Sequence, residues 1–357
     1  MSNNIKIFLP DGSEKSLPAN STGFDLANSI GKGLAKSAVA YKVDETQYDL
    51  SDQLQDKAQV SIITIQSEEG LEIMRHTLTA QVLARAIKNL YPKSKLAIGP
   101  TIEDGFYYDV ESEEVISSDD LIKIEDEMKN IVKTKSLLTK KLVSKSEALK
   151  IFKEKKEPFK ETIINESNQK NDFQLYYQDN EEFVDLCRGP HLPNLGFIGS
   201  FKLTKVSGAY WKGDSKNTML TRIYGTAFNS DKDLQKHLNE VEEALKRDHR
   251  KLGREMDLFH FQDEAPGMVF WHPKGWTIFR LLEDFIRNKQ LKAGYEEIKT
   301  PQVLDRKLWE KSGHWEKYRE NMYITEIDEE HANEKRVNAL KPMSCPAHVQ
   351  IYKQGIK

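Results

Sequence analysis

The sequence has little cysteine, no long apolar run and no strong excess of one charge. Cys187 and Cys345 are the only cysteines among its 357 residues. Two cysteines are too few for a disulfide framework and favour a reducing compartment. No segment reaches the roughly 18 consecutive apolar residues of a membrane-spanning helix, and no secretory signal opens the chain. We therefore expect a cytoplasmic protein without a membrane partner.

The two signs of charge are nearly balanced. Lysine and arginine number 53 against 56 aspartates and glutamates, a formal net charge of −3. This excludes a strongly basic nucleic-acid binder, although a locally basic face remains possible. A composition of 38% hydrophobic and 31% charged residues excludes collagen and low-complexity disorder. At ~150 residues per domain, the length predicts two or three domains.

Residues 1–64 are predicted to form a small β-grasp module. The apolar run 5–9 predicts a strand, and the Pro10-Asp11-Gly12 sequence that follows predicts a hairpin turn. Thr22 is placed to cap a short helix, and residues 60–64 predict a closing strand.

Residues 65–229 are predicted to form an α+β domain. Apolar spacing predicts a helix over 71–90, a strand over 104–110 and a further helix capped by Ser118. Residues 140–160 contain eight lysines and three glutamates. This run predicts either a solvated helix face or a surface for an RNA backbone.

Residues 230–252 are predicted to be a linker helix, and 253–357 the start of a third domain. In that domain, apolar spacing predicts a helix over 277–291, followed by a strand over 295–298. The last segment ends without a polar tail, so we expect the sequence to be part of a longer chain.

Cysteine and histidine are paired at short spacing in two places. Cys187 and His191 stand four apart, and the intervening proline favours a turn. A thiol and an imidazole at this spacing could bind zinc or hold a substrate hydroxyl and a water, but a structural role is equally consistent. Cys345 and His348 stand three apart, a spacing more typical of a buried free cysteine.

His76 lies on the predicted helix 71–90 without a metal-binding partner at the next turn. Position i+4 is Ala80, and Gln81 at i+5 lies about 140° around the helix. A glutamine amide can hydrogen-bond a substrate, but it is a poor zinc ligand and no general base. A structural role, as a hydrogen-bonded surface or core histidine, is the alternative to a catalytic role for His76.

Several strings, in order, resemble the threonyl-tRNA synthetases, a family of class II aminoacyl-tRNA synthetases. The strings that resemble the second additional domain are Cys187–His191, Gly208–Ser215 and Arg222–Thr226. Asp248–Gly253 resembles the junction into the catalytic core. Pro266–Trp271 and Gly275–Arg280 resemble class II motif 1, the dimer-forming element, and Ser312–Trp315 and Lys341–Pro346 resemble later parts of the core.

The resemblance implies an α+β multidomain fold. It assigns a ubiquitin-like TGS domain to 1–64, an editing domain with the second additional domain to 65–229, a linker helix to 230–252, and the beginning of the class II antiparallel-sheet core to 253–357. The implied activity is ATP-dependent attachment of threonine to tRNA(Thr), with Mg²⁺-bound ATP as substrate and a homodimer formed through motif 1. Class II motifs 2 and 3 are absent from the sequence, so we expect no threonine-dependent ATP–pyrophosphate exchange from this chain alone. A stand-alone trans-editing deacylase and an inactive RNA-binding relative are the alternatives.

The resemblance also implies two amino-acid sites. Met343 and Cys345 would contact the substrate, and Cys345 would be the first of three ligands to a catalytic Zn²⁺. Such a zinc takes the amino group and hydroxyl of threonine and so rejects valine. Serine differs from threonine by one methyl group, worth only about 1–3 kcal/mol, so a second site must hydrolyse seryl-tRNA.

By the same resemblance, Cys187, His191, Asp185 and His76 are catalytic residues of that second, editing site. The family's first editing string places two histidines four apart. This sequence instead reads His76-Thr77-Leu78-Thr79-Ala80-Gln81, with one extra residue and glutamine in place of the second histidine. We therefore predict that hydrolysis of seryl-tRNA is retained but weakened.

Overall fold

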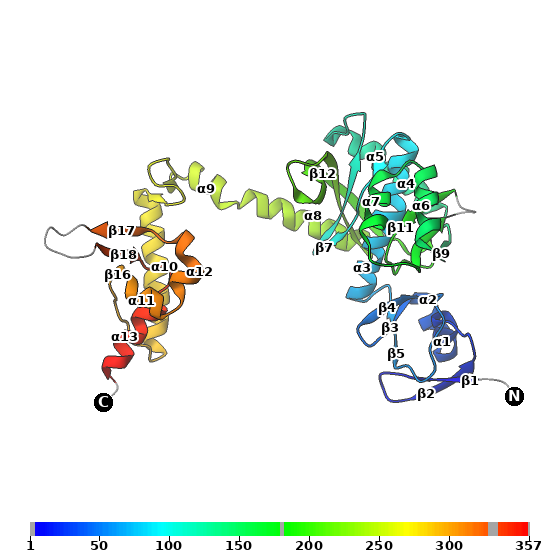
Figure 1. The fold of residues 1–357 in the computed structure, drawn as a ribbon, viewed down its shortest axis with the longest axis horizontal. Helices are drawn as coiled ribbons and strands as arrows, with labels where there is room; N and C mark the ends of the chain where they lie inside the picture. Colours follow the sequence, from blue (N-terminus) through cyan, green and yellow to red (C-terminus); the bar gives the residue numbers. More distant parts are fainter. Residues whose placement is uncertain (1–3, 179–181, 328–334, 356–357) are drawn as a thin grey trace. The chain divides into compact units, whose positions relative to one another are not determined.

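The structure, a computed structural model, describes residues 4–178, 182–327 and 335–355. The chain divides into two compact units, residues 1–246 and 247–357 (Figure 1). The division falls inside the predicted linker 230–252. Among the described residues, no helix has the length and apolar character needed to cross a membrane.

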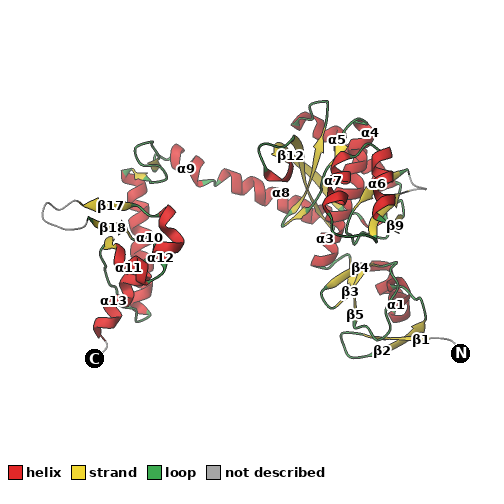
Figure 2. Ribbon diagram, in the orientation of Figure 1, coloured by secondary structure: helices red, strands yellow, loops and turns green. Residues whose placement is uncertain are grey.

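The N-terminal module of the first unit mixes a hairpin, two short helices and a three-stranded sheet (Figure 2). Its elements are β1 (Asn4–Phe8), β2 (Glu14–Pro18), α1 (Gly23–Ile30), α2 (Lys32–Ser37), β3 (Ala38–Val43), β4 (Thr46–Asp49) and β5 (Val60–Thr64). The predicted hairpin and closing strand are confirmed. Thr22 caps α1 as predicted, because its hydroxyl accepts from the Asp25 N–H while the Asp25 carboxylate accepts from the Thr22 N–H.

The second module of the first unit contains two antiparallel sheets, ordered β12-β13-β8-β6 with β7 beside β8, and β11-β10-β9. Its strands are β6 (Lys95–Leu96), β7 (Thr101–Ile102), β8 (Gly105–Glu111), β9 (Leu138–Val143), β10 (Phe173–Gln178), β11 (Phe183–Leu186), β12 (Ser200–Tyr210) and β13 (Met219–Phe228). Its helices are α3 (Glu68–Thr77), a π-helical turn (Leu78–Leu83), α4 (Ala84–Leu90), α5 (Leu121–Lys133), α6 (Lys145–Glu154) and α7 (Pro158–Glu166). Short 3₁₀ turns cover Ser118–Asp120, Leu195–Phe197 and Trp211–Gly213.

Three local predictions for this module need correction or refinement. The helix predicted over 71–90 is α3, the π-helical turn and α4 in succession. Ser117, not Ser118, caps the turn before α5, because its hydroxyl accepts from the Asp119 N–H. The lysine-rich run 140–160 is not one helix face, since it spans β9, α6 and the start of α7.

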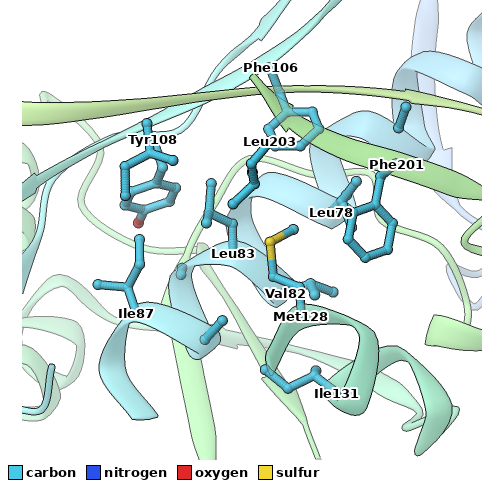
Figure 3. Packing of buried hydrophobic residues seen from close by; sticks show 14 of the residues in the cluster. Leu78, Val82, Leu83, Ile87, Phe106, Tyr108, Met128, Ile131, Phe201 and Leu203 are labelled. Atoms are coloured by element: carbon cyan, nitrogen blue, oxygen red, sulfur yellow. The ribbon is translucent and has the colours of Figure 1, made fainter. Parts of the chain in front are cut away.

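The helical segment α3–α4 is anchored by the main core of the first unit. Apolar side chains of this segment pack with side chains of β8, α5 and β12 (Figure 3). The residues labelled there are Leu78, Val82, Leu83, Ile87, Phe106, Tyr108, Met128, Ile131, Phe201 and Leu203. All ten are less than 9% exposed. This packing gives His76, near the end of α3, a rigid base.

The remaining elements run from α8 to α13. They are α8 (Asp231–Lys246), α9 (His249–Glu255), β14 (Phe259–His260), β15 (Phe270–Trp271), α10 (Pro273–Lys292), β16 (Val303–Asp305), α11 (Arg306–Lys311), α12 (His314–Tyr318), a 3₁₀ turn (Arg319–Asn321), β17 (Ile324–Ile327), β18 (Arg336–Leu340) and α13 (Cys345–Gly355). The second unit contains an antiparallel sheet ordered β16-β18-β17 and the pair β14-β15.

Two predictions for this part of the chain are wrong in detail. The single helix predicted over 230–252 is two helices, because Asp248 caps the start of α9 with its side chain. Residues 295–298, which the structure describes, lie outside any strand, and the first strand after α10 is β16. The helix predicted over 277–291 is confirmed as α10, which begins four residues earlier at Pro273.

Candidate active site

A cleft of about 1220 Å³ lies between the N-terminal module and the second module. β4 and the turn after it supply one wall, including Asp49 and Asp52. His76, Asp185 and Cys187 line the cleft from the second module. Three of the four predicted editing residues therefore share one cavity, and the fourth, His191, is buried close to them.

Cys187 and His76 form a thiol–imidazole pair in this cleft. The Cys187 sulfur lies 2.8 Å from Nε2 of His76, and both residues are half-buried. Burial lowers the pKa of the His76 imidazole below its ordinary 6.5, although nearby carboxylates, Asp185 foremost, oppose part of that shift. His76 is therefore a neutral imidazole at pH 7, able to accept a proton.

His191 is held behind this pair in a single tautomer. Its Nδ1 lies 3.1 Å from the Thr77 hydroxyl, which donates its own proton to the Ile73 carbonyl at 2.8 Å. A hydroxyl has one proton, so in the neutral imidazole of His191 Nδ1 carries the hydrogen and Nε2 carries the lone pair. That Nε2 is buried without a hydrogen-bond partner among the described residues. It is an acceptor that a small bound hydroxyl or water could satisfy.

The turn between Cys187 and His191 is the one predicted from Pro190. Gly189 adopts a positive φ of 64°, and the Gly189–Pro190 peptide bond is cis. A Cβ at position 189 would also collide with the Tyr176 hydroxyl, so both conformation and space require glycine there. The turn brings the His191 ring against His76, with centroids 4.7 Å apart and planes 4° from parallel.

The stacking of the two histidine rings also bears on the hypothesis that Cys187 and His191 bind zinc. Candidate ligand atoms of His76, Cys187 and His191 lie within 4.8 Å of one another. An imidazole binds a metal along its nitrogen lone pair, in the plane of the ring. Two stacked parallel rings share no such plane, so an ion bound by both histidines would require one ring to turn. The observed arrangement favours proton transfer and hydrogen bonding over metal binding.

Gln81 does not take the place of a second cleft histidine. Leu78–Leu83 form a π-helical turn, a form of helix that holds one extra residue per turn. This turn coincides with the extra residue inferred from the sequence. Of the described residues, Ala80 lines the cleft and Gln81 does not. The fully buried Gln81 instead accepts a 3.0 Å hydrogen bond on Oε1 from the Gln178 amide.

Asp185 is held by two residues that the sequence reasoning missed. Its Oδ1 lies 2.6 Å from the Lys160 ammonium, and the Tyr108 hydroxyl donates to its Oδ2 at 3.1 Å. Burial, reinforced by the Asp185 charge, keeps the pKa of Tyr108 well above its ordinary value, so this hydroxyl remains a donor. Lys160 gave no signal in the sequence because it belongs to the run assigned to surface contacts.

The second unit places Cys345 and Met343 on its surface. Cys345 is exposed and begins α13, which contradicts the buried cysteine expected from spacing, and Met343 is 43% exposed. A catalytic zinc requires three protein ligands. Across the described ranges, the only cluster of candidate ligands is the one at His76, and Cys345 does not belong to it. The described residues therefore do not form a zinc site at Cys345.

Comparison with known proteins identifies two domains in the first unit. Residues 5–64 match the TGS domain family, and residues 174–224 match the family described as the threonyl and alanyl tRNA synthetase second additional domain. Each match covers one segment of the first unit.

Comparison with individual proteins makes the family specific. Threonine–tRNA ligase of Brucella melitensis biotype 2 (strain ATCC 23457) is 51% identical over 100% of this chain and 54% of its own length. That of Prochlorococcus marinus (strain MIT 9515) is 50% identical over 99% of this chain and 54% of its own length. A solved structure of the RNA binding domain of threonyl-tRNA synthetase from Cryptosporidium parvum Iowa II is 38% identical, covers 31% of this chain and 26% of that chain, and has a TM-score of 0.29. The chain is homologous over essentially its whole length to threonine–tRNA ligases, and it spans about half the length of the curated relatives it matches.

Proposed function

We propose that the cleft hydrolyses the ester bond of mischarged seryl-tRNA(Thr). The observation that carries this proposal is the neutral His76 imidazole beside the Cys187 thiol, with the unpartnered Nε2 of His191 stacked behind them. The cleft also exposes Arg188, a cation suited to the phosphates of an RNA 3′ end.

The chemistry needs one base and no cofactor. His76 Nε2 accepts a proton from a water molecule as the water oxygen attacks the ester carbonyl. The bond from the carbonyl carbon to the ribose oxygen then breaks, and the His76 imidazolium returns the proton to that oxygen. The Cys187 thiol, which lies against His76 Nε2 in the free cleft, gives up that position to the attacking water, and His191 Nε2 accepts a hydrogen bond from the serine hydroxyl or from the water. The products are serine and free tRNA.

We propose that this chain is part of a longer protein with threonine–tRNA ligase activity, the activity for which its relatives are named. Its substrates would be threonine, tRNA(Thr) and Mg²⁺-bound ATP, and it would act in the cytoplasm as a homodimer joined through motif 1. Cys345 would supply one ligand and Met343 a substrate contact at a zinc site completed by residues outside this sequence. The domain limits 1–64, 65–229, 230–252 and 253–357 are part of the same proposal.

Deacylation of purified seryl-tRNA(Thr) by the 357-residue chain tests the hydrolytic proposal. Replacing His76 by alanine should lower kcat by ~10²-fold or more, the usual contribution of a general base. Cys187→Ala should also slow the reaction, whereas Cys345→Ala, which removes the chain's other thiol, should leave the rate unchanged. If Cys187→Ala and His76→Ala both matched the unaltered chain, the cleft would not be the hydrolytic site.

A further inference from the structure

The carboxylate of Asp49 reaches from the N-terminal module into the wall of the active site. Asp49 is the last residue of β4, and its side chain is 9% exposed. Its Oδ1 accepts the backbone N–H of His191 at 2.8 Å. Its Oδ2 accepts the Tyr176 hydroxyl at 2.6 Å and lies 2.8 Å from the Lys140 ammonium. Asp49 of the N-terminal module therefore binds the main chain of His191, a candidate catalytic residue.

Asp49 also acts on the His191 side chain through Tyr176. The Tyr176 ring meets the imidazole edge-on, with centroids 4.3 Å apart and planes at 82°. Burial raises the pKa of the Tyr176 hydroxyl, and the Asp49 charge adds to the shift, so the hydroxyl stays protonated and keeps donating. Asp49 thus fixes the backbone of His191 directly, and it fixes the His191 ring indirectly through Tyr176.

Asp52 has a similar environment but lacks this connection. It lies 2.5 Å from the same Lys140 ammonium and accepts the Asp49 N–H at 3.1 Å. Among the described residues, Asp52 makes no hydrogen bond to His191 or Tyr176. The two carboxylates therefore share a cation and a module, and they differ in whether they touch the histidine.

We propose that Asp49 is a positioning residue of the hydrolytic site, and that the site is complete only when the N-terminal module supplies this carboxylate. The inference rests on the proposed hydrolytic function. Its physical reason is geometric: a displacement of about 1 Å in a reacting constellation can cost ~10²-fold in rate. Without the Asp49 carboxylate, the His191 N–H lacks its acceptor and the ring lacks a fixed neighbour.

Four variants of the 357-residue chain separate positioning from charge. Asp49→Ala should lower kcat for seryl-tRNA(Thr) by about tenfold to a hundredfold with little change in KM. Asp49→Asn should lose less kcat than Asp49→Ala, because its amide oxygen can still accept the His191 N–H although its NH₂ group cannot accept the Tyr176 hydroxyl. Asp52→Ala and Asp52→Asn should each lower kcat by less than Asp49→Ala does, because Asp52 makes no hydrogen bond to His191 or Tyr176 among the described residues. Equal kcat for Asp49→Ala and Asp52→Ala, or equal losses for Asp49→Ala and Asp49→Asn, would overturn the proposal.

Hydrogen exchange supplies a readout that does not depend on activity. The amide of His191 should exchange faster in Asp49→Ala than in Asp52→Ala, while β8 and β13 amides stay equally protected in both. Unchanged exchange at His191 would overturn the positioning role even if the unaltered chain hydrolysed seryl-tRNA. If the chain lacked hydrolytic activity but the His191 amide lost protection, only the proposed function would fail. Should Asp49→Ala not fold, Tyr176→Phe decides: a lower kcat at constant KM supports the inference, and an unchanged kcat overturns it.

Discussion

Replacing Lys160 by methionine probes the buried charges beside the cleft. Lys160 and Asp185 are 3% and 2% exposed, and Nζ lies 2.6 Å from Oδ1. Methionine removes the charge with a modest change in volume. Asp185 would keep the Tyr108 hydroxyl and the Leu186 N–H as donors, but it would lose its cation.

The expected cost follows from this burial. Removing one partner of a buried ion pair typically destabilises a protein by about 3–5 kcal/mol, because the other charge stays buried and uncompensated. Replacing both partners by uncharged groups is often close to neutral. Lys160→Met should therefore lose about 3–5 kcal/mol, and Lys160→Met combined with Asp185→Asn should recover most of that loss.

The assay must report on the first unit, because Lys160 and Asp185 both lie in it. Hydrogen exchange of β8 and β11 peptides along a urea titration meets this need and gives the free energy of unfolding of this module. A loss below about 1 kcal/mol in Lys160→Met would refute the reasoning. So would a double variant no more stable than Lys160→Met.

Three further predictions concern the histidines and their supports. Because burial lowers the pKa of His76 below its ordinary 6.5, the fall of kcat for deacylation in acid should have its midpoint below pH 6.5. A midpoint above 6.5 in the pH–rate profile would argue against His76 as the base. Thr77→Val should cost about 1–3 kcal/mol in the same urea titration, because it leaves Nδ1 of His191 and the Leu192 N–H without an acceptor, whereas Thr101→Val, at an exposed hydroxyl, should change stability little. Gly189→Ala should reduce both stability and kcat, since a Cβ there meets Tyr176, and a variant equal to the unaltered chain in circular dichroism melts and in rate would contradict the proposed constraint.

Local signals in the sequence predicted local structure. The Thr22 cap was predictable because its partner, Asp25, lies three residues away. The strand expected over 295–298 was wrong because a short apolar run carries no information about its pairing partner. The lysine run 140–160 was misassigned for a related reason: Lys140 and Lys160 find their carboxylates in Asp49 and Asp185, far along the chain.

The candidate site was predictable only as far as the family resemblance reached. Spacing around His76 offered no partner at the next helical turn, because its partner is Cys187, 111 residues away. Asp49 could not be predicted for the same reason, since it lies 142 residues before His191 in the sequence. The resemblance named His76, Cys187, His191 and Asp185 without giving their contacts. The tautomer of His191 and the cation beside Asp185 emerge only in three dimensions.

The π-helical turn explains how the site tolerates an extra residue in its first string. An insertion in an α-helix rotates every later side chain by about 100° relative to the earlier ones, which would expose Leu83 and Ile87 and break the core. The π-helical turn at Leu78–Leu83 confines the extra residue to one turn, so His76 keeps its place before it and the core residues keep theirs after it. The side chain displaced is at position 81, which faces Gln178 instead of the cleft. The chain therefore has one helical histidine at the cleft, and the weakened hydrolysis of seryl-tRNA that the sequence predicts would have this geometric origin.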